Sequence, residues 1–139
     1  MTYELILLDA DGTLFDYDRA EKYAIETTFR DFGLDYSDSI LSRYRVVNDA
    51  LWKELERGNI TSVELRVERF RRLLAEIREA DAEALSRRYL HHLARGSYLI
   101  DGAEDICRYM AQRYTLAILT NGIAEVQRSR LAKSALHGV

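Results

Sequence analysis

Two short apolar runs frame a long helical stretch, and this arrangement limits the folds open to the chain. Residues 3–8 end in Leu5-Ile6-Leu7-Leu8, and the second run is Thr115-Leu116-Ala117-Ile118-Leu119. Each run is short, aliphatic and followed at once by polar turn residues, which is typical of a parallel strand buried on both faces. Between them, from about residue 19 to residue 95, apolar residues recur at helical spacing. The pattern predicts an α/β fold whose strands are separated by a helical block.

Glycines and capping residues divide the helical parts, because the chain contains no proline. Thr61 and Glu64 have the spacing of a capping box, which predicts the start of a helix. Asp101 is expected to cap a later helix through its side chain. The expected helices cover about 19–32, 40–55, 63–77, 81–95 and 103–112, with another from residue 123 onward.

Composition and charge exclude several classes of function. Twenty basic and twenty-three acidic residues give a net charge of -3, so we expect no nucleic-acid partner. The longest apolar run, Leu5–Leu8, is far shorter than the roughly twenty residues that cross a bilayer, and no signal peptide pattern precedes it. We therefore expect a cytoplasmic chain without a membrane partner. Its one cysteine, Cys107, has no partner for an internal disulfide and is expected to pack on a buried helix face.

The first run ends in Asp9-Ala10-Asp11-Gly12-Thr13, a pattern suited to phosphoryl transfer. Attack on a phosphate monoester needs a nucleophile that is ionised at neutral pH, and a carboxylate meets this need without a separate base. Asp9 is the candidate nucleophile. Asp11, two residues on, is placed to protonate the leaving alcohol and later to deprotonate water. Mg²⁺, a hard cation that bridges carboxylate and phosphate oxygens, would offset the repulsion between them.

A hairpin turn and a calcium-binding loop are two other interpretations of this motif. Asp11-Gly12 between apolar residues is also a two-residue hairpin signal, and this alternative stays open. A calcium-binding EF-hand is excluded, because its glycine would come at the sixth position of the loop. In this run Gly12 comes at the fourth position.

The second run ends in Thr120-Asn121-Gly122. A threonine hydroxyl and turn amides at the end of a parallel strand, next to a helix start, form a suitable cradle for phosphate. Asn-Gly is also the commonest hairpin turn, so this motif alone favours a hairpin. The two motifs together, each ending an apolar strand, are much more specific than either one.

Together, Asp9-Ala10-Asp11-Gly12-Thr13-Leu14 and Thr120-Asn121-Gly122 resemble the first two motifs of haloacid dehalogenase (HAD)-like hydrolases. The resemblance implies an α/β fold with a partial Rossmann-like HAD core at residues 1–18 and 97–139, and an inserted α-helical cap at 19–96. It implies Asp9 as nucleophile and Asp11 as acid/base, with Mg²⁺ bound by Asp9 and by the main-chain carbonyl of Asp11. It also implies that Thr120, Asn121 and Gly122 bind the phosphate.

Further segments are similar to the pyrimidine 5′-nucleotidases within this family. They are Val47-Asn48-Asp49-Ala50-Leu51-Trp52, Gly58-Asn59-Ile60-Thr61 and Leu99-Ile100-Asp101-Gly102-Ala103. The resemblance implies hydrolysis of nucleoside 5′-monophosphates. A carboxylate at Asp11 favours phosphate esters over haloacids, and sugar-phosphate phosphatases or mutases remain alternatives.

The chain departs from the family pattern beyond its second motif. Family members continue with a lysine and an acidic pair that complete the metal site, whereas this sequence stops at Val139, seventeen residues after Gly122. Lys133 lies in a helical segment and is interpreted as a solvated lysine. We therefore expect a truncated chain with impaired catalysis. The alternative is a non-catalytic module that forms homo-oligomers through its exposed strand edges.

Overall fold

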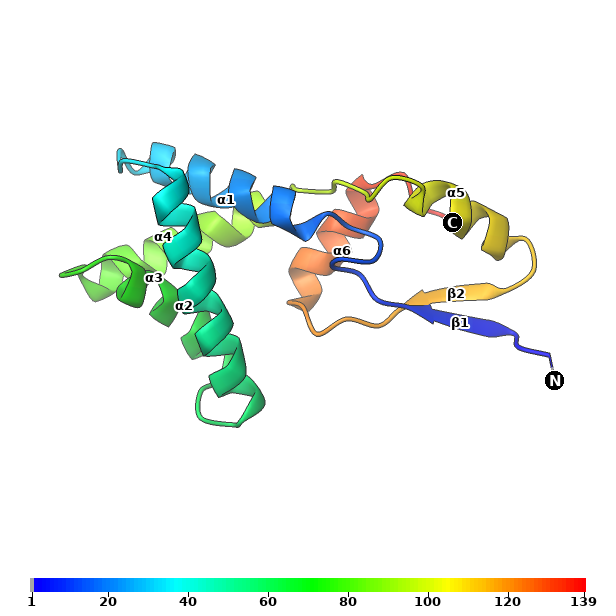
Figure 1. Ribbon diagram of the computed structural model, residues 1–139, viewed down its shortest axis with the longest axis horizontal. Coiled ribbons are helices and arrows are strands. Elements are labelled where there is room, and N and C mark those ends of the chain that lie inside the picture. The colour runs from blue at the N-terminus through cyan, green and yellow to red at the C-terminus, as the bar shows by residue number, and fades with distance from the viewer. Residues whose placement is uncertain (1) are drawn as a thin grey trace. The chain divides into compact units, whose positions relative to one another are not determined.

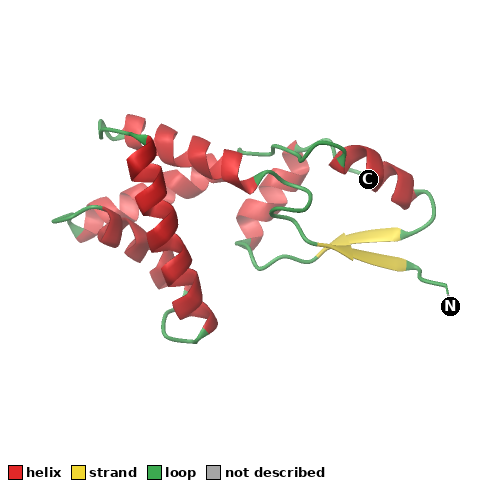
Figure 2. Cartoon of the chain, in the orientation of Figure 1, coloured by secondary structure: helices red, strands yellow, loops and turns green. Residues whose placement is uncertain are grey.

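The computed structural model describes residues 2–139, apart from the side chain of Ala80. This part of the chain forms two strands and six α-helices (Figures 1 and 2). In chain order these are β1 (Leu5–Leu8), α1 (Tyr17–Asp31), α2 (Asp38–Glu56), α3 (Ser62–Leu73), α4 (Glu79–Leu93), α5 (Ala103–Ala111), β2 (Thr115–Ile118) and α6 (Ala124–Lys133). The predicted α/β class, with five helices between the two strands, is confirmed. None of these helices is long and apolar enough to cross a membrane.

The two strands form a parallel pair, although about a hundred residues separate them along the chain (Figure 1). Leu8 lies opposite Ile118, and the amide of Leu119 donates a hydrogen bond to the Leu8 carbonyl at 2.9 Å. Parallel strands end at the same edge of a sheet, so the two turn motifs leave from one edge. Both hairpin interpretations are therefore wrong, because neither turn joins antiparallel strands.

The expectation that the first strand is buried on both faces is also wrong. Leu5 and Leu7 are 50% and 57% exposed, whereas Ile6 and Leu8 are half-buried. Alternate residues of a strand point to opposite faces, so one face of β1 packs inward and the other meets solvent. Within residues 2–139 nothing covers that second face.

The chain divides into two compact units, residues 1–24 with 91–139 and residues 25–90. The first unit contains the sheet and a small apolar core, which includes Ala10, Phe15, Ala103 and Cys107. Cys107 is 2% exposed and not in a disulfide, and burial raises the pKa of its thiol. The packing role expected for this cysteine is confirmed.

The second unit is built around an aromatic cluster. The rings of Tyr44, Phe70 and Tyr89 lie with centroids 5.5 to 6.1 Å apart, and all three side chains are buried. The buried guanidinium of Arg69 lies 4.5 Å from the Tyr89 ring centroid, and it donates to Asn48 at 3.4 Å. Rings of this kind stabilise a buried cation through their negative faces. This unit therefore has a core of its own.

Two helix ends test the capping predictions. The Thr61 hydroxyl accepts from the Glu64 amide at 3.2 Å, and a Glu64 carboxylate oxygen accepts from the Thr61 amide at 2.8 Å. The predicted capping box is confirmed. Asp101 does not cap α5, because Gly102 occupies the N-cap with a left-handed backbone (φ 83°) and no side-chain bond. The helix begun at Thr61 also ends at Leu73, earlier than the expected residue 77.

The capping box gives a pH-dependent contribution to stability. Hydrogen bonds from the Thr61 amide, and then from its hydroxyl, hold the pKa of Glu64 below its usual value of 4.5. A lowered folded pKa means that the ionised side chain stabilises the fold above pH 4.5 and loses this effect as pH falls through the folded pKa. Glu64→Gln should therefore lower the urea midpoint at pH 7, and the difference from wild type should shrink below pH 4.5. Thr61→Ala should cost about 1 kcal/mol at pH 7.

Urea unfolding followed by far-UV circular dichroism measures both effects. Glu56→Gln, at the exposed end of α2, removes a charge without a capping role and serves as the control. An equal loss for Glu56→Gln and Glu64→Gln, or a loss for Glu64→Gln that does not change with pH, would contradict this account of the cap.

Candidate active site

A tight loop follows β1 and positions both aspartates. The Ala10 carbonyl accepts from the amides of Leu14 and Phe15, each at 2.9 Å, and the Gly12 amide donates to the Phe15 carbonyl at 3.0 Å. Gly12 has φ 79°, a left-handed conformation that favours glycine. The chain thus turns back on itself directly at the strand end, with Ala10, Leu14 and Phe15 buried beneath the loop.

The two aspartates of this loop have different surroundings. Asp9 is exposed, and its Oδ1 accepts from the Ala10 amide at 2.9 Å, its one hydrogen bond within residues 2–139. The Asp11 side chain is 29% exposed and accepts hydrogen bonds on both of its oxygens. Asp9 is therefore available to an incoming ligand, whereas Asp11 is held in place.

The second turn leads from β2 into α6. The Gly122 amide donates to the Thr120 hydroxyl at 3.1 Å, Asn121 is exposed, and α6 begins two residues later at Ala124. The N-cap of α6, Ile123, makes no side-chain capping bond. Ile123 therefore gives the first amides of the helix no side-chain cap, and amides at a helix start suit an anion.

Gln127 on α6 joins the two turns. Its Nε2 donates to Asp11 Oδ2 at 2.8 Å and to the Thr120 hydroxyl at 3.0 Å. The proposed acid/base and the proposed phosphate-binding hydroxyl are therefore bonded to one nitrogen atom. The structure brings Asp11 and Thr120 together, with Asp9 at the end of the same paired strands.

Arg130 is the second α6 side chain in this group. Its Nη1 donates to Asp11 Oδ1 at 2.5 Å and to Gln127 Oε1 at 2.9 Å, and its Nε donates to the Gly96 carbonyl at 2.9 Å. The side chain is only 1% exposed, and its guanidinium lies 4.7 Å from the Phe15 ring centroid. Burying an arginine is costly unless its guanidinium is paired, and Asp11 is the acidic side chain that pairs with Arg130.

Sequence reasoning did not identify Gln127 or Arg130. They are three residues apart, so a helix places them on one face, and they follow the Thr120 turn closely. That spacing was the available signal. It does not reveal that this polar face of α6 turns toward the loop after β1.

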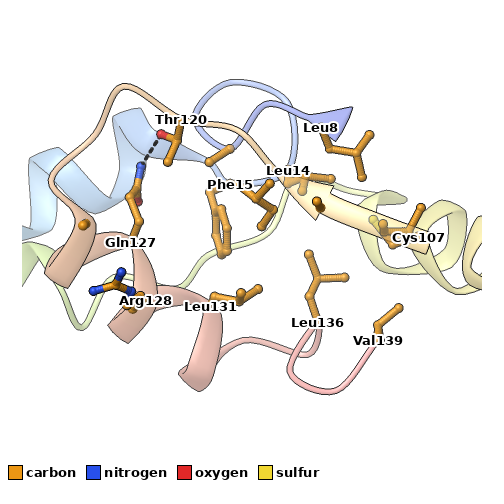
Figure 3. A pocket seen from close by; sticks show the side chains of 15 residues that line it. Leu8, Leu14, Phe15, Cys107, Thr120, Gln127, Arg128, Leu131, Leu136 and Val139 are labelled. Carbon is orange, nitrogen blue, oxygen red and sulfur yellow. Dashed lines mark hydrogen bonds between the residues drawn. The ribbon is translucent and has the colours of Figure 1, made fainter. Parts of the chain in front are cut away.

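An apolar cavity of about 470 Å³ lies beside these residues within the first unit (Figure 3). In Figure 3 Thr120 and Gln127 point toward each other at one end, and Cys107 and Val139 lie at the other end. The lining is mostly aliphatic and aromatic, from side chains such as Leu14, Phe15, Leu131 and Leu136. Such a lining does not suit a phosphate, so the polar end at Thr120 is the candidate phosphate site.

The oxygen atoms near the two turns offer few ligands for Mg²⁺. Residues 2–139 contain no group of three or more His, Cys, Asp or Glu side chains that could hold a metal. Mg²⁺ usually needs only one or two carboxylates, with waters and phosphate oxygens completing its shell. Asp9 has an exposed carboxylate that suits this role. The Asp11 carboxylate is already engaged by Gln127 and Arg130, so a metal would use its main-chain carbonyl instead.

Comparison with known proteins agrees with this geometry. A family model described as haloacid dehalogenase-like hydrolase matches residues 3–138. The chain belongs to the HAD-like hydrolases. The resemblance inferred from the two motifs, and the partial HAD core, are confirmed.

Several relatives of this HAD-like chain are similar over almost all of its length. YfnB of Bacillus subtilis, named as a HAD-hydrolase, is 36% identical over 96% of this chain. PynA of Streptococcus pneumoniae and YjjG of Escherichia coli, both named pyrimidine 5′-nucleotidase, are 37% and 27% identical over 98% of it. A crystal structure of YfnB, described as bound to magnesium, superposes with a TM-score of 0.89 at 35% identity and covers 98% of this chain.

The HAD-like chain spans little more than half of these relatives. It covers 57% of YfnB, 58% of PynA, 59% of YjjG and 61% of the solved YfnB chain. Both motifs that carry the candidate site lie within the shared part.

The buried ion pair at the site should contribute measurably to stability. Arg130→Met would remove the donor to Asp11 Oδ1 and to the Gly96 carbonyl, which we expect to cost about 3 kcal/mol. Lys133→Met is the matched control, because Lys133 is exposed on the same helix and its loss should change stability by less than about 0.5 kcal/mol. Urea denaturation at pH 7 measures both. Equal effects of the two substitutions would show that the Arg130 pair contributes nothing specific.

Proposed function

We propose that this chain carries the nucleophile and the acid/base of a Mg²⁺-dependent phosphatase that works through an aspartyl phosphate. The observation that carries the proposal is the shared Gln127 nitrogen. It bonds the carboxylate of Asp11 and the hydroxyl of Thr120, 2.8 and 3.0 Å away, so one hydrogen-bonded group contains parts of both motifs. A phosphoryl group bound at Thr120 would then lie beside the loop that presents Asp9.

The proposed chemistry has two half-reactions. In the first, a carboxylate oxygen of Asp9 bonds to phosphorus, the bond from phosphorus to the ester oxygen breaks, and Asp11 protonates the leaving alcohol. In the second, water attacks phosphorus, the bond to Asp9 breaks, and Asp11 takes the proton of the water. Thr120 and the amides at the start of α6 would hold the phosphoryl oxygens through both steps.

A bound Mg²⁺ would neutralise the charge that two carboxylates and a phosphate bring together. Asp9 and the main-chain carbonyl of Asp11 are its proposed ligands. The crystal structure of YfnB described as bound to magnesium supports this choice of ion.

Nucleoside 5′-monophosphates, pyrimidine nucleotides in particular, are the proposed substrates. Two relatives that match 98% of this chain, PynA and YjjG, are named pyrimidine 5′-nucleotidases. The helical block 19–96 is the proposed cap domain, and residues 1–18 and 97–139 are the proposed partial core. Sugar phosphates are the competing substrate class, for a phosphatase or mutase of the same family.

A second candidate function has one observation in its favour. Tyr3, Leu5, Leu7 and Leu119 are large, apolar and exposed on or next to a two-stranded sheet. Exposed strands of this kind promote association, which is the behaviour of a non-catalytic module that forms homo-oligomers. Dependence of turnover on Asp9 separates the two functions.

The nucleophile assignment is tested by phosphate release from a panel of nucleoside and sugar monophosphates with Mg²⁺. The 139-residue chain should release phosphate slowly, roughly 10²- to 10³-fold below YfnB in the same assay, because residues 2–139 contain no group of three or more His, Cys, Asp or Glu side chains to hold the metal. Asp9→Asn should abolish the release, since an amide neither attacks phosphorus nor carries charge. Pyrimidine nucleotides should be the best substrates.

Asp105→Asn, an exposed aspartate on α5, is the control and should leave the rate unchanged. Release that is identical for wild type and Asp9→Asn would refute the assignment and favour the non-catalytic module. Turnover as fast as that of YfnB would contradict the expected impairment.

A further inference from the structure

We infer that Gln127 and Arg130 are positioning residues that hold Asp11 as the base for the second half-reaction. This inference rests on the proposed phosphatase function and assigns a role to two side chains outside both motifs. Neither residue need touch the substrate, since both act through Asp11.

The hydrogen bonds around Asp11 fix the orientation of its carboxyl group. Oδ1 accepts from Arg130 Nη1 and Oδ2 accepts from Gln127 Nε2, so each oxygen receives one donor. An ionised carboxylate only accepts hydrogen bonds and offers about four lone-pair positions. Each oxygen therefore keeps a lone pair for another proton, and the side chain is 29% exposed to solvent. A carboxyl group that is held in one orientation and keeps a free lone pair can accept a proton from the attacking water.

The step that depends on this state is hydrolysis of the aspartyl phosphate. The water oxygen forms a bond to phosphorus as the bond between phosphorus and the Asp9 oxygen breaks. One water proton passes to the Asp11 carboxylate, and inorganic phosphate leaves. A base that has rotated away by an ångström would slow this step by up to about 10²-fold. Orientation of Asp11 should therefore limit the second half-reaction.

Gln127 fixes this orientation relative to the phosphate site. Its Nε2 bonds Asp11 and Thr120 together, and its Oε1 accepts from Arg130 at 2.9 Å. The amide is thereby prevented from flipping, because its oxygen would then face the Asp11 carboxylate oxygen and its NH₂ group would face the Arg130 donor. Arg130 is in turn held by the Gly96 carbonyl and by the ring of Phe15.

Gly122 provides the space for this arrangement. A Cβ at residue 122 would lie 2.4 Å from Gln127 Nε2 and 2.9 Å from its Cδ, so any side chain there must displace the Gln127 amide. The displaced amide would lose its bonds to both Asp11 and Thr120. Gly122→Ala should therefore reproduce the loss of Gln127 without changing any polar side chain.

The main experiment measures the two half-reactions separately with p-nitrophenyl phosphate and Mg²⁺. Gln127→Leu should form aspartyl phosphate at nearly the wild-type rate and hydrolyse it about 10- to 100-fold more slowly. Gly122→Ala changes a proposed phosphate-binding residue as well, so it should slow both steps, with the larger loss in hydrolysis. p-Nitrophenol should then appear in a burst close to one per protein molecule, followed by a slow phase. Intact-protein mass spectrometry should detect the phosphorylated chain, and Asp9→Asn should not acquire the added mass.

Three further variants separate positioning from folding. Arg130→Lys keeps a cation near Asp11 and should show a smaller burst than Gln127→Leu. Leu131→Ala removes a half-buried apolar side chain from the same helix, and Lys133→Met removes an exposed charge from it. Loss of folded protein lowers both half-reactions equally, so neither control should produce a burst.

The outcomes distinguish this inference from the proposed function. If wild type is phosphorylated on Asp9 but Gln127→Leu and Gly122→Ala hydrolyse the phosphoenzyme at the wild-type rate, the inference is overturned and the proposed function stands. A burst in Leu131→Ala as large as that in Gln127→Leu would also overturn it.

A second readout does not depend on turnover. The Gln127 side-chain amide protons, assigned by their loss in Gln127→Leu, should exchange slowly with water in wild type and rapidly in Asp11→Ala. If no protein is phosphorylated, wild type included, the proposed function fails and the role of the contact in hydrolysis fails with it, whereas slow exchange would still show that the contact exists. Rapid exchange in wild type would overturn the inference.

Discussion

The parallel pairing of β1 with β2 is the constraint on which the candidate site depends. Leu5–Leu8 and Thr115–Ile118 align with Leu8 opposite Ile118, so the Asp9 loop and the Thr120 turn leave the sheet at one edge. Parallel strands require a long crossover, and most of that connection is helical here. Gln127, on the helix that follows the β2 turn, joins Thr120 to Asp11. A shift in the strand register would move this turn relative to the Asp9 loop and would separate Thr120 from Asp11.

Hydrogen bonds from α6 join the two turns that the strand pairing brings to one edge. Arg130 is buried, and its Nε and Nη1 donate to the Gly96 carbonyl, Asp11 and Gln127, whereas its buried Nη2 has no hydrogen-bond partner within residues 2–139. Removing one member would leave buried polar groups unpaired, so the group is stable only in one arrangement. Gly96 also fits closely against α1, since a Cβ there would lie 2.7 Å from the Ala20 Cβ. The same contacts therefore secure both the core of this unit and the geometry of the site.

Much of the fold followed from the sequence, because its signals are local. Strand runs ending in Asp9 and Thr120, the helical block and the Thr61 capping box depend on residues close together in the chain. The errors involve distant parts of the chain. Burial of both faces of β1 depends on which elements cover the strand, and the Asp101 cap failed because Gly102 occupies the N-cap. Both hairpin signals were overridden by pairing with a strand far away in sequence.

In the candidate site, too, residues in short motifs are predictable from the sequence, whereas residues joined by long-range contacts are not. Asp9, Asp11, Thr120, Asn121 and Gly122 form recognisable short motifs, whereas Gln127 and Arg130 look like ordinary polar helix residues. Their contacts to Asp11 span more than a hundred residues, so no local pattern reveals them. Gly122 was assigned to phosphate binding for its place in the turn. Its close approach to the Gln127 amide gives a further reason for a glycine there.

The most direct test of this account is an NMR measurement of the strand pairing itself. In the structure the Leu119 amide nitrogen lies 2.9 Å from the Leu8 carbonyl oxygen. The account therefore predicts a scalar coupling across this hydrogen bond, between the Leu119 amide nitrogen and the Leu8 carbonyl carbon. It also predicts short interproton distances between Leu7 or Leu8 and the facing residues of β2. Absence of that coupling, with β1 instead showing antiparallel contacts across an Asp11-Gly12 hairpin, would contradict it.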